Sequence, residues 1–337
     1  YLGNLLSDRK RHQEAIAMWE RATELDSSFP TAWRNLGFGY YNVLHDAARA
    51  RDAFARARKL APQDARILYE QDQLSKRIGV HPEVRLGALE ENRSLVERRD
   101  DLSVELATLY NNVGQPDRAL SILLSHPFQP WEGGEGLVLA QFVRASVLLA
   151  QRALETGDAQ AAFAYLSAAR NPPESLGEAH HLLVNLSALD YWMGMACAQR
   201  GDPFGGAVHL ERAARAQGDF RQMQVQPISD VTYWSALALR RLGREKEATE
   251  LFHRIQDYAR ELHQQTPVID YFATSLPAML LFDEDLKERQ TIQAYFLEAQ
   301  ALLGLGAAAE ATARLRRVLS MDRNHPGAID LLRVQEA

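Results

Sequence analysis

The apolar positions of the chain recur at helical spacing in a motif of about 34 residues. The clearest copy carries Trp33, Leu36, Gly37, Tyr40, Ala50, Phe54, Ala57 and Pro62. Copies with the same order of large and small residues begin at the N-terminus and recur as far as 295–318. Because each copy predicts two helices joined by a turn, we expect about seven or eight helix pairs.

The order of large and small residues in this motif has a packing reason. Two antiparallel helices approach closely only where the side chains are small, as at Gly37, Ala50 and Ala57, and larger residues such as Trp33 and Phe54 fill the space between pairs. One pair cannot bury its own apolar face, so neighbouring pairs must stack. The sequence contains no sustained alternating run bounded by hairpin turns. We therefore predict an all-α fold, a right-handed superhelical solenoid of helix-turn-helix repeats with irregular insertions.

Four stretches interrupt the repeat, at 126–136, 171–178, 217–230 and 257–291. Long loops are uncommon in compact proteins and often carry function or cover a partner surface. We accordingly divide the chain into four parts. They are N-terminal repeats (1–124), middle repeats with Pro/Gly loops (125–256), an irregular helical insertion (257–291), and a C-terminal repeat with its cap (292–337).

The motif resembles the tetratricopeptide repeat (TPR). Four short segments extend the resemblance: WEGGEG at 131–136, IDYFA at 269–273, SLP at 275–277 and FDEDL at 282–286. With these, the chain is similar to the C-terminal TPR region of large bacterial proteins that carry a carbohydrate-associated N-terminal domain of unknown function. The resemblance implies no catalytic residues, and it makes an N-terminal domain of the same parent chain a candidate partner. The first residues already have the pattern of a helix interior, so we expect the chain to come from a longer polypeptide.

The first helices of stacked pairs line a concave surface, where we expect a partner to bind. The repeat register places these candidate side chains on it: Arg34, Phe38, Tyr41, Asn42, Tyr191, Tyr233, Arg240 and Phe296. Aromatic rings offer contact area at low entropy cost, and arginine binds carboxylates through two hydrogen bonds. Arg34 and Asn42 could clamp a peptide C-terminus, although the paired lysines of such clamps are missing. The alternative is that these aromatic residues pack against the chain's own insertions.

The loop at 131–136 sets Trp131 beside two carboxylates, Glu132 and Glu135. We count Trp131 among the partner-binding candidates, as a sugar-stacking or docking tip. An enzyme would use the two glutamates as an acid–base pair, but nothing in the sequence brings them together. The alternative is a tight loop whose tryptophan fills the core. For the acidic run at 283–285 we favour a helix start, where carboxylates meet the positive end of the dipole, over a metal or acid–base role.

Composition narrows the classes of function further. The chain carries 38 basic and 44 acidic residues, a net charge of −6, and its basic runs are short, so we predict no nucleic-acid partner. Its single cysteine, Cys197, excludes a disulfide framework and a multi-cysteine metal site, and no His-Glu-x-x-His motif occurs. No uncharged stretch approaches the roughly 18 residues that span a bilayer. We predict no metal, no cofactor and no membrane partner, and a cytoplasmic location from the scarcity of cysteine.

These observations predict a non-catalytic scaffold that binds a peptide, a protein partner or a neighbouring domain through its concave surface. The alternative is an accessory module of a bacterial carbohydrate-active protein, with Trp131 and the 257–291 insertion touching sugar or the catalytic domain. Under the first hypothesis, alanine at Arg34 and Tyr233 together should weaken partner capture without unfolding the chain.

Overall fold

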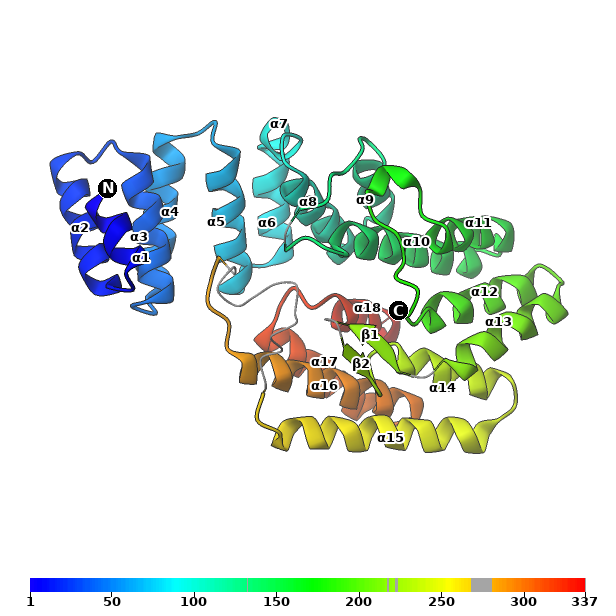
Figure 1. The fold of residues 1–337 in the computed structure, drawn as a ribbon. Coiled ribbons are helices and arrows are strands. Elements are labelled where there is room, and N and C mark those ends of the chain that lie inside the picture. Colours follow the sequence, from blue (N-terminus) through cyan, green and yellow to red (C-terminus); the bar gives the residue numbers. More distant parts are fainter. Residues whose placement is uncertain (132, 217, 222–223, 268–280, 337) are drawn as a thin grey trace. The chain divides into compact units, whose positions relative to one another are not determined.

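The computed structural model describes every residue except 132, 217, 222–223, 268–280 and 337 (Figure 1). Over the described residues the chain is helical apart from its loops and one short hairpin, and it forms two compact units. Unit 1 comprises residues 1–102 together with 281–284, and unit 2 comprises the described residues of 103–267 and 285–336. The predicted all-α architecture of stacked helix pairs is confirmed. The two units divide the chain at different places from the four predicted segments.

Unit 1 is a run of antiparallel helices, each packed against the next. Its helices are α1 (Leu2–Asp8), α2 (His12–Leu25), α3 (Pro30–Asn42), α4 (Ala47–Leu60), α5 (Ala65–Arg77), α6 (Pro82–Glu90) and α7 (Arg93–Val96). In the pair α3–α4, a Cβ atom added to Gly37 would lie 2.4 Å from the ring of Phe54. Phe54 and the neighbouring Leu36 are fully buried. This contact is the predicted packing of a small residue against a large one, and only glycine permits so close an approach.

Unit 2 continues the same arrangement from α8 (Asp100–Asn112), which begins at the end of unit 1. Its other elements are α9 (Pro116–Leu123), α10 (Leu137–Glu155), α11 (Ala159–Arg170), η1 (Glu174–Leu176), α12 (Ser187–Gln199), α13 (Pro203–Arg215), β1 (Asp219–Arg221), β2 (Gln224–Gln226), α14 (Thr232–Arg241), α15 (Glu245–Gln264), α16 (Leu286–Gly304), α17 (Ala308–Met321) and α18 (Pro326–Glu336). Gly201 joins α12 to α13 with φ +83°, in the left-handed region that glycine adopts without strain. The eight helix pairs from α1–α2 to α16–α17 agree with the expected number.

The last helix of unit 2 returns to its first helices. Arg144 of α10 holds Asp330 of α18 through two hydrogen bonds of 2.8 and 2.9 Å. The same arginine donates to the side chain of Asn112, and Arg333 of α18 donates to the backbone oxygen of Asn112. Unit 2 therefore binds its C-terminal helix through residues of its own helices α8 and α10.

Some local expectations need correction, and one is confirmed. The stretch 217–230, predicted as an irregular join, contains an antiparallel hairpin in which Phe220 pairs with Val225. Helices α15 and α16 extend into the predicted 257–291 insertion from both sides, to Gln264 and from Leu286. The expectation that the acidic run at 283–285 begins a helix is confirmed: α16 follows it, and Oδ1 of Asp285 accepts hydrogen bonds from the backbone N–H groups of Lys287 and Glu288 at 2.8 and 3.1 Å.

One helix bears on the question of a membrane. Among the described residues, α10 alone has the length and apolar composition that could cross a bilayer. It contains Arg144, whose guanidinium is bound to Asp330, and buried residues such as Phe142 and Ala145 pack inside unit 2. About a third of the apolar stretch of α10 is buried inside the protein.

Candidate functional site

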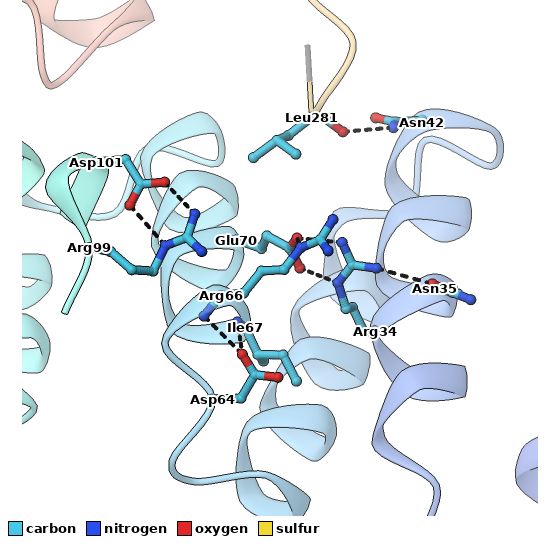
Figure 2. Close-up of polar contacts among 10 residues, drawn as sticks. All are labelled: Arg34, Asn35, Asn42, Asp64, Arg66, Ile67, Glu70, Arg99, Asp101 and Leu281. Atoms are coloured by element: carbon cyan, nitrogen blue, oxygen red, sulfur yellow. Dashed lines mark hydrogen bonds and ion pairs between the residues drawn. The ribbon is translucent and has the colours of Figure 1, made fainter. Parts of the chain in front are cut away.

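The four predicted partner-binding residues of the second repeat lie together on α3, and residues 281–284 lie against three of them, Phe38, Tyr41 and Asn42. We call residues 281–284 the docked segment. The side-chain amide of Asn42 donates to the backbone oxygen of Leu281 at 3.1 Å (Figure 2). The side-chain oxygen of Asn42 accepts the backbone N–H of Asp283 at 3.0 Å. Asn42 therefore binds the backbone of the chain's own docked segment. The predicted clamping of a partner's C-terminus by Arg34 and Asn42 stays a prediction.

The ring of Phe282 fills an aromatic pocket on this face. Its centroid lies 5.1 Å from those of both Phe38 and Tyr41, and 6.0 Å from that of Phe54. Phe282 is 2% exposed. At the end of the docked segment, Glu284 forms an ion pair with Arg77 of α5 at 3.1 Å. The alternative raised from the sequence, that the aromatic residues pack against an insertion of the same chain, is confirmed for Phe38 and Tyr41.

Arg34 points toward α5 and is engaged by a buried carboxylate. Its guanidinium binds both oxygens of Glu70, and Nε of Arg66 donates to the same carboxylate at 2.9 Å (Figure 2). The side chain of Glu70 is 2% exposed, that of Arg34 18% and that of Arg66 62%. Arg34 is therefore a partner of Glu70 inside unit 1, whereas Arg66 reaches the surface.

A shallow cavity of about 440 Å³, largely open to solvent, lies beside Arg66. It is lined by Gln63, Asp64, Ala65, Arg66, Arg98 and Arg99, from the start of α5 and the turn between α7 and α8. We call it the basic cavity. The one carboxylate in its lining, Asp64, caps α5 by accepting the backbone N–H groups of Arg66 and Ile67 at 2.9 and 3.2 Å (Figure 2).

The three arginines of the basic cavity differ in how much of their charge is already paired. Arg99 binds Asp101 through two hydrogen bonds of 3.0 and 2.6 Å, and that bond together with the attraction of the carboxylate raises the pKa of Arg99. Arg66 shares Glu70 with Arg34. Arg98 is exposed and forms no ion pair with the residues that the structure describes. The lining thus has a local excess of positive charge in a chain whose net charge is −6, and it suits a carboxylate group.

The predicted partner-binding residues of unit 2 are spread through its packing. Tyr191, Tyr233 and Phe296 are 4% to 8% exposed and belong to different apolar clusters. Burial raises the pKa of Tyr233 to about 12. Arg240 donates to the backbone oxygen of Gly304 at 2.7 Å. Binding of a partner by these residues has not been tested and stays a prediction, but the three rings offer a partner little surface.

The described residues of the Trp131 loop make contacts within the loop itself. Trp131 is half-buried, and its ring lies so close to Gly134 that an added Cβ atom would meet it at 1.9 Å. Glu135 accepts the backbone N–H of Gly133 at 2.9 Å, inside the loop. Glu132 and the motifs at 269–273 and 275–277 lie outside the described residues. No group of three or more His, Cys, Asp or Glu side chains suited to a metal ion occurs among the residues described, and Cys197 is buried as expected.

Sequence reasoning missed the basic cavity and the docked segment. Arg98 and Arg99 belong to the run ERRDD at 97–101. Its mixed charges are typical of a solvent-exposed helix face, so the sequence did not single out these two arginines as a binding site. Phe282 belongs to the FDEDL motif, and an aromatic residue ahead of an acidic run was the available signal. Nothing in the local pattern tells which distant helix receives that ring.

Comparison with known proteins gives one family match and several distant structural likenesses. A model of the TPR repeat family matches residues 3–43, which hold most of α1 and all of α2 and α3. Among solved structures, the TPR protein YrrB, described as having an unusual peptide-binding site, shares 20% identity over 64% of this chain and 82% of its own, with a TM-score of 0.32. The apo form of the quorum sensor NprR from B. thuringiensis shares 12% identity over 95% of this chain and 85% of its own, with a TM-score of 0.41. The Naa15/Naa10 complex bound to HypK-THB matches with 13% identity over 95% of this chain and 57% of the other, also with a TM-score of 0.41. At these TM-scores the likenesses say nothing about what this chain binds.

Proposed function

We propose that this protein is a non-catalytic interaction scaffold, and that unit 1 binds a carboxylate-bearing peptide segment of a protein partner in the basic cavity. The observation that carries the proposal is the charge of that cavity: three arginines line it, and its one carboxylate is occupied in capping α5. Arginine forms paired, charge-assisted hydrogen bonds with carboxylates, either of acidic side chains or of a chain terminus. Arg98, exposed and without an ion pair among the described residues, is the principal contact.

Rigidity of the surrounding helices supports this role. Arg66 and Arg99 are each held by a carboxylate, so their guanidinium groups lose little further freedom when a ligand binds. The half-buried Trp131 gives no specific support to a carbohydrate-associated role, which stays a prediction from the sequence alone.

The test begins with random dodecapeptides displayed on phage and selected against the full chain. We expect the selected peptides to be enriched in Asp and Glu. Synthetic copies of the tightest binders should lose about tenfold or more in affinity for Arg98→Ala, because a hydrogen bond to a charged group contributes about 1.5–3 kcal/mol. Affinity should also fall when the salt concentration is raised from about 50 to 200 mM.

The matched control is Arg317→Ala, which removes an exposed arginine from α17 and changes the net charge equally. It should leave binding unchanged. Selected peptides without acidic enrichment, or equal losses for Arg98→Ala and Arg317→Ala, would contradict the proposal.

A further inference from the structure

The docked segment binds unit 1 through contacts of the kind that proteins use to hold a peptide. The side chain of Asn42 forms hydrogen bonds with the backbone oxygen of Leu281 and with the backbone N–H of Asp283. Such contacts bind the main chain of a peptide whatever its side chains are. Between those two bonds the ring of Phe282 enters the aromatic pocket. The docked segment itself forms neither helix nor strand, so its order depends on these contacts with unit 1.

We propose that this face of α3 is a peptide-binding groove of its own. The groove takes an aromatic residue followed two positions later by an acidic residue, and in this chain the docked segment occupies it as an internal ligand. The pocket formed by Phe38, Tyr41 and Phe54 selects the aromatic ring, and Arg77 selects the carboxylate of Glu284. A partner peptide with the same order of residues binds by displacing the docked segment.

The groove is separate from the basic cavity. Arg66 in the first turn of α5 lines the cavity, and Arg77 at the last residue of α5 contacts the docked segment. At 1.5 Å per residue, these two positions lie about 16 Å apart along the helix axis. Binding in the groove therefore does not depend on Arg98, and the two proposals can fail independently.

An internal ligand lowers the affinity of the groove for a free peptide. A tethered segment competes at an effective concentration that reaches the millimolar range. A free peptide of the same sequence therefore binds the intact chain far more weakly than it binds a chain whose groove is empty.

The experiment uses the full chain with residues 281–284 replaced by Gly-Ser-Gly-Ser, which we call the emptied variant. The probe is a fluorescein-labelled peptide with the sequence of residues 281–286, LFDEDL, followed by fluorescence anisotropy. We expect saturable binding to the emptied variant and at least tenfold weaker binding to the intact chain. A peptide with alanine in place of phenylalanine keeps the same charge, and should bind the emptied variant about 30-fold more weakly because the buried ring is lost.

Two further variants show whether the peptide occupies the groove itself. Asn42→Ala in the emptied variant should weaken binding about tenfold by removing both backbone contacts. Arg317→Ala, which removes an exposed arginine from α17, should leave it unchanged. If the emptied variant has lost helical circular dichroism, an excess of the peptide must restore it, since a ligand that binds only the folded state stabilises that state. Three results would overturn the proposal: no binding of the peptide to a folded emptied variant, no restoration of helical circular dichroism in an unfolded one, or equal binding of the alanine peptide. The docked segment would then only stabilise the fold of unit 1.

Discussion

The two arginines that share Glu70 allow a sharp test of how burial sets the strength of an ion pair. Arg34 gives two of the three hydrogen bonds that the carboxylate accepts, and its side chain is 18% exposed. Arg66 gives the third, from a side chain that is 62% exposed. We expect Arg34→Met to destabilise unit 1 by about 2–4 kcal/mol, because it leaves a buried carboxylate with one exposed partner. Arg66→Met should cost about 0.5–1 kcal/mol, as exposed pairs do.

The double variant Arg34→Met/Glu70→Leu removes both buried charges together. Replacing a buried ion pair with apolar residues of similar size is often close to neutral, since the cost of taking the charges out of water disappears with them. We therefore expect this variant to recover most of the stability that Arg34→Met loses.

Hydrogen exchange of the backbone amides of α3 and α5, followed by mass spectrometry, gives the free energy of opening within unit 1 and does not require the whole chain to unfold in one step. The reasoning is refuted if Arg34→Met costs no more than Arg66→Met, or if the double variant is less stable than Arg34→Met. The structure changes the expectation drawn from the sequence, in which alanine at Arg34 and Tyr233 together left the fold intact. Arg34 binds a buried carboxylate and Tyr233 is buried, so loss of binding in that variant would not separate a contact from a destabilised fold.

Three other outcomes are expected. Gly37→Ala should lower the free energy of unfolding by about 1–3 kcal/mol, because its Cβ would lie 2.4 Å from a buried ring. Gly87→Ala, with no atom within 4 Å of the added Cβ, should raise the free energy of unfolding by about 0.5–1 kcal/mol. Thermal melting of the two variants checks both, and an equal shift in melting temperature contradicts the packing argument. Burial lowers the pKa of His325 in the folded chain below its usual 6.5. As the pH falls, His325 is therefore protonated in the unfolded chain before it is protonated in the folded chain. The free energy of unfolding should accordingly fall as the pH drops below about 6.5. Urea titrations of wild type and His325→Gln should show this part of the pH dependence only in wild type, and identical slopes would contradict it. Arg144→Ala removes the paired hydrogen bonds to Asp330 and should speed amide exchange in α18 about tenfold; unchanged exchange would mean that other contacts hold the helix.

Sequence spacing was sufficient for the helix pairs because their packing is local. Gly37 and Phe54 lie within one repeat, and the size of one side chain dictates how closely the two helices approach. The same locality explains the turn at Gly201, whose positive φ suits the residue there. The ends of α15 and α16 also carry local signals: Pro267 lies three residues after the last residue of α15, and Asp285 caps α16.

In the candidate site, too, the sequence determined some features and the tertiary structure determined others. The repeat register alone determined that Phe38, Tyr41 and Asn42 share one face of a first helix, because a helix repeats its directions every 3.6 residues. Only the tertiary structure decided what that face meets. The contact between Asn42 and Asp283 joins residues 241 positions apart, and no local pattern encodes such a pairing. A periodic sequence specifies which way a side chain points from its own helix, whereas its exposure depends on every other segment that folds against it.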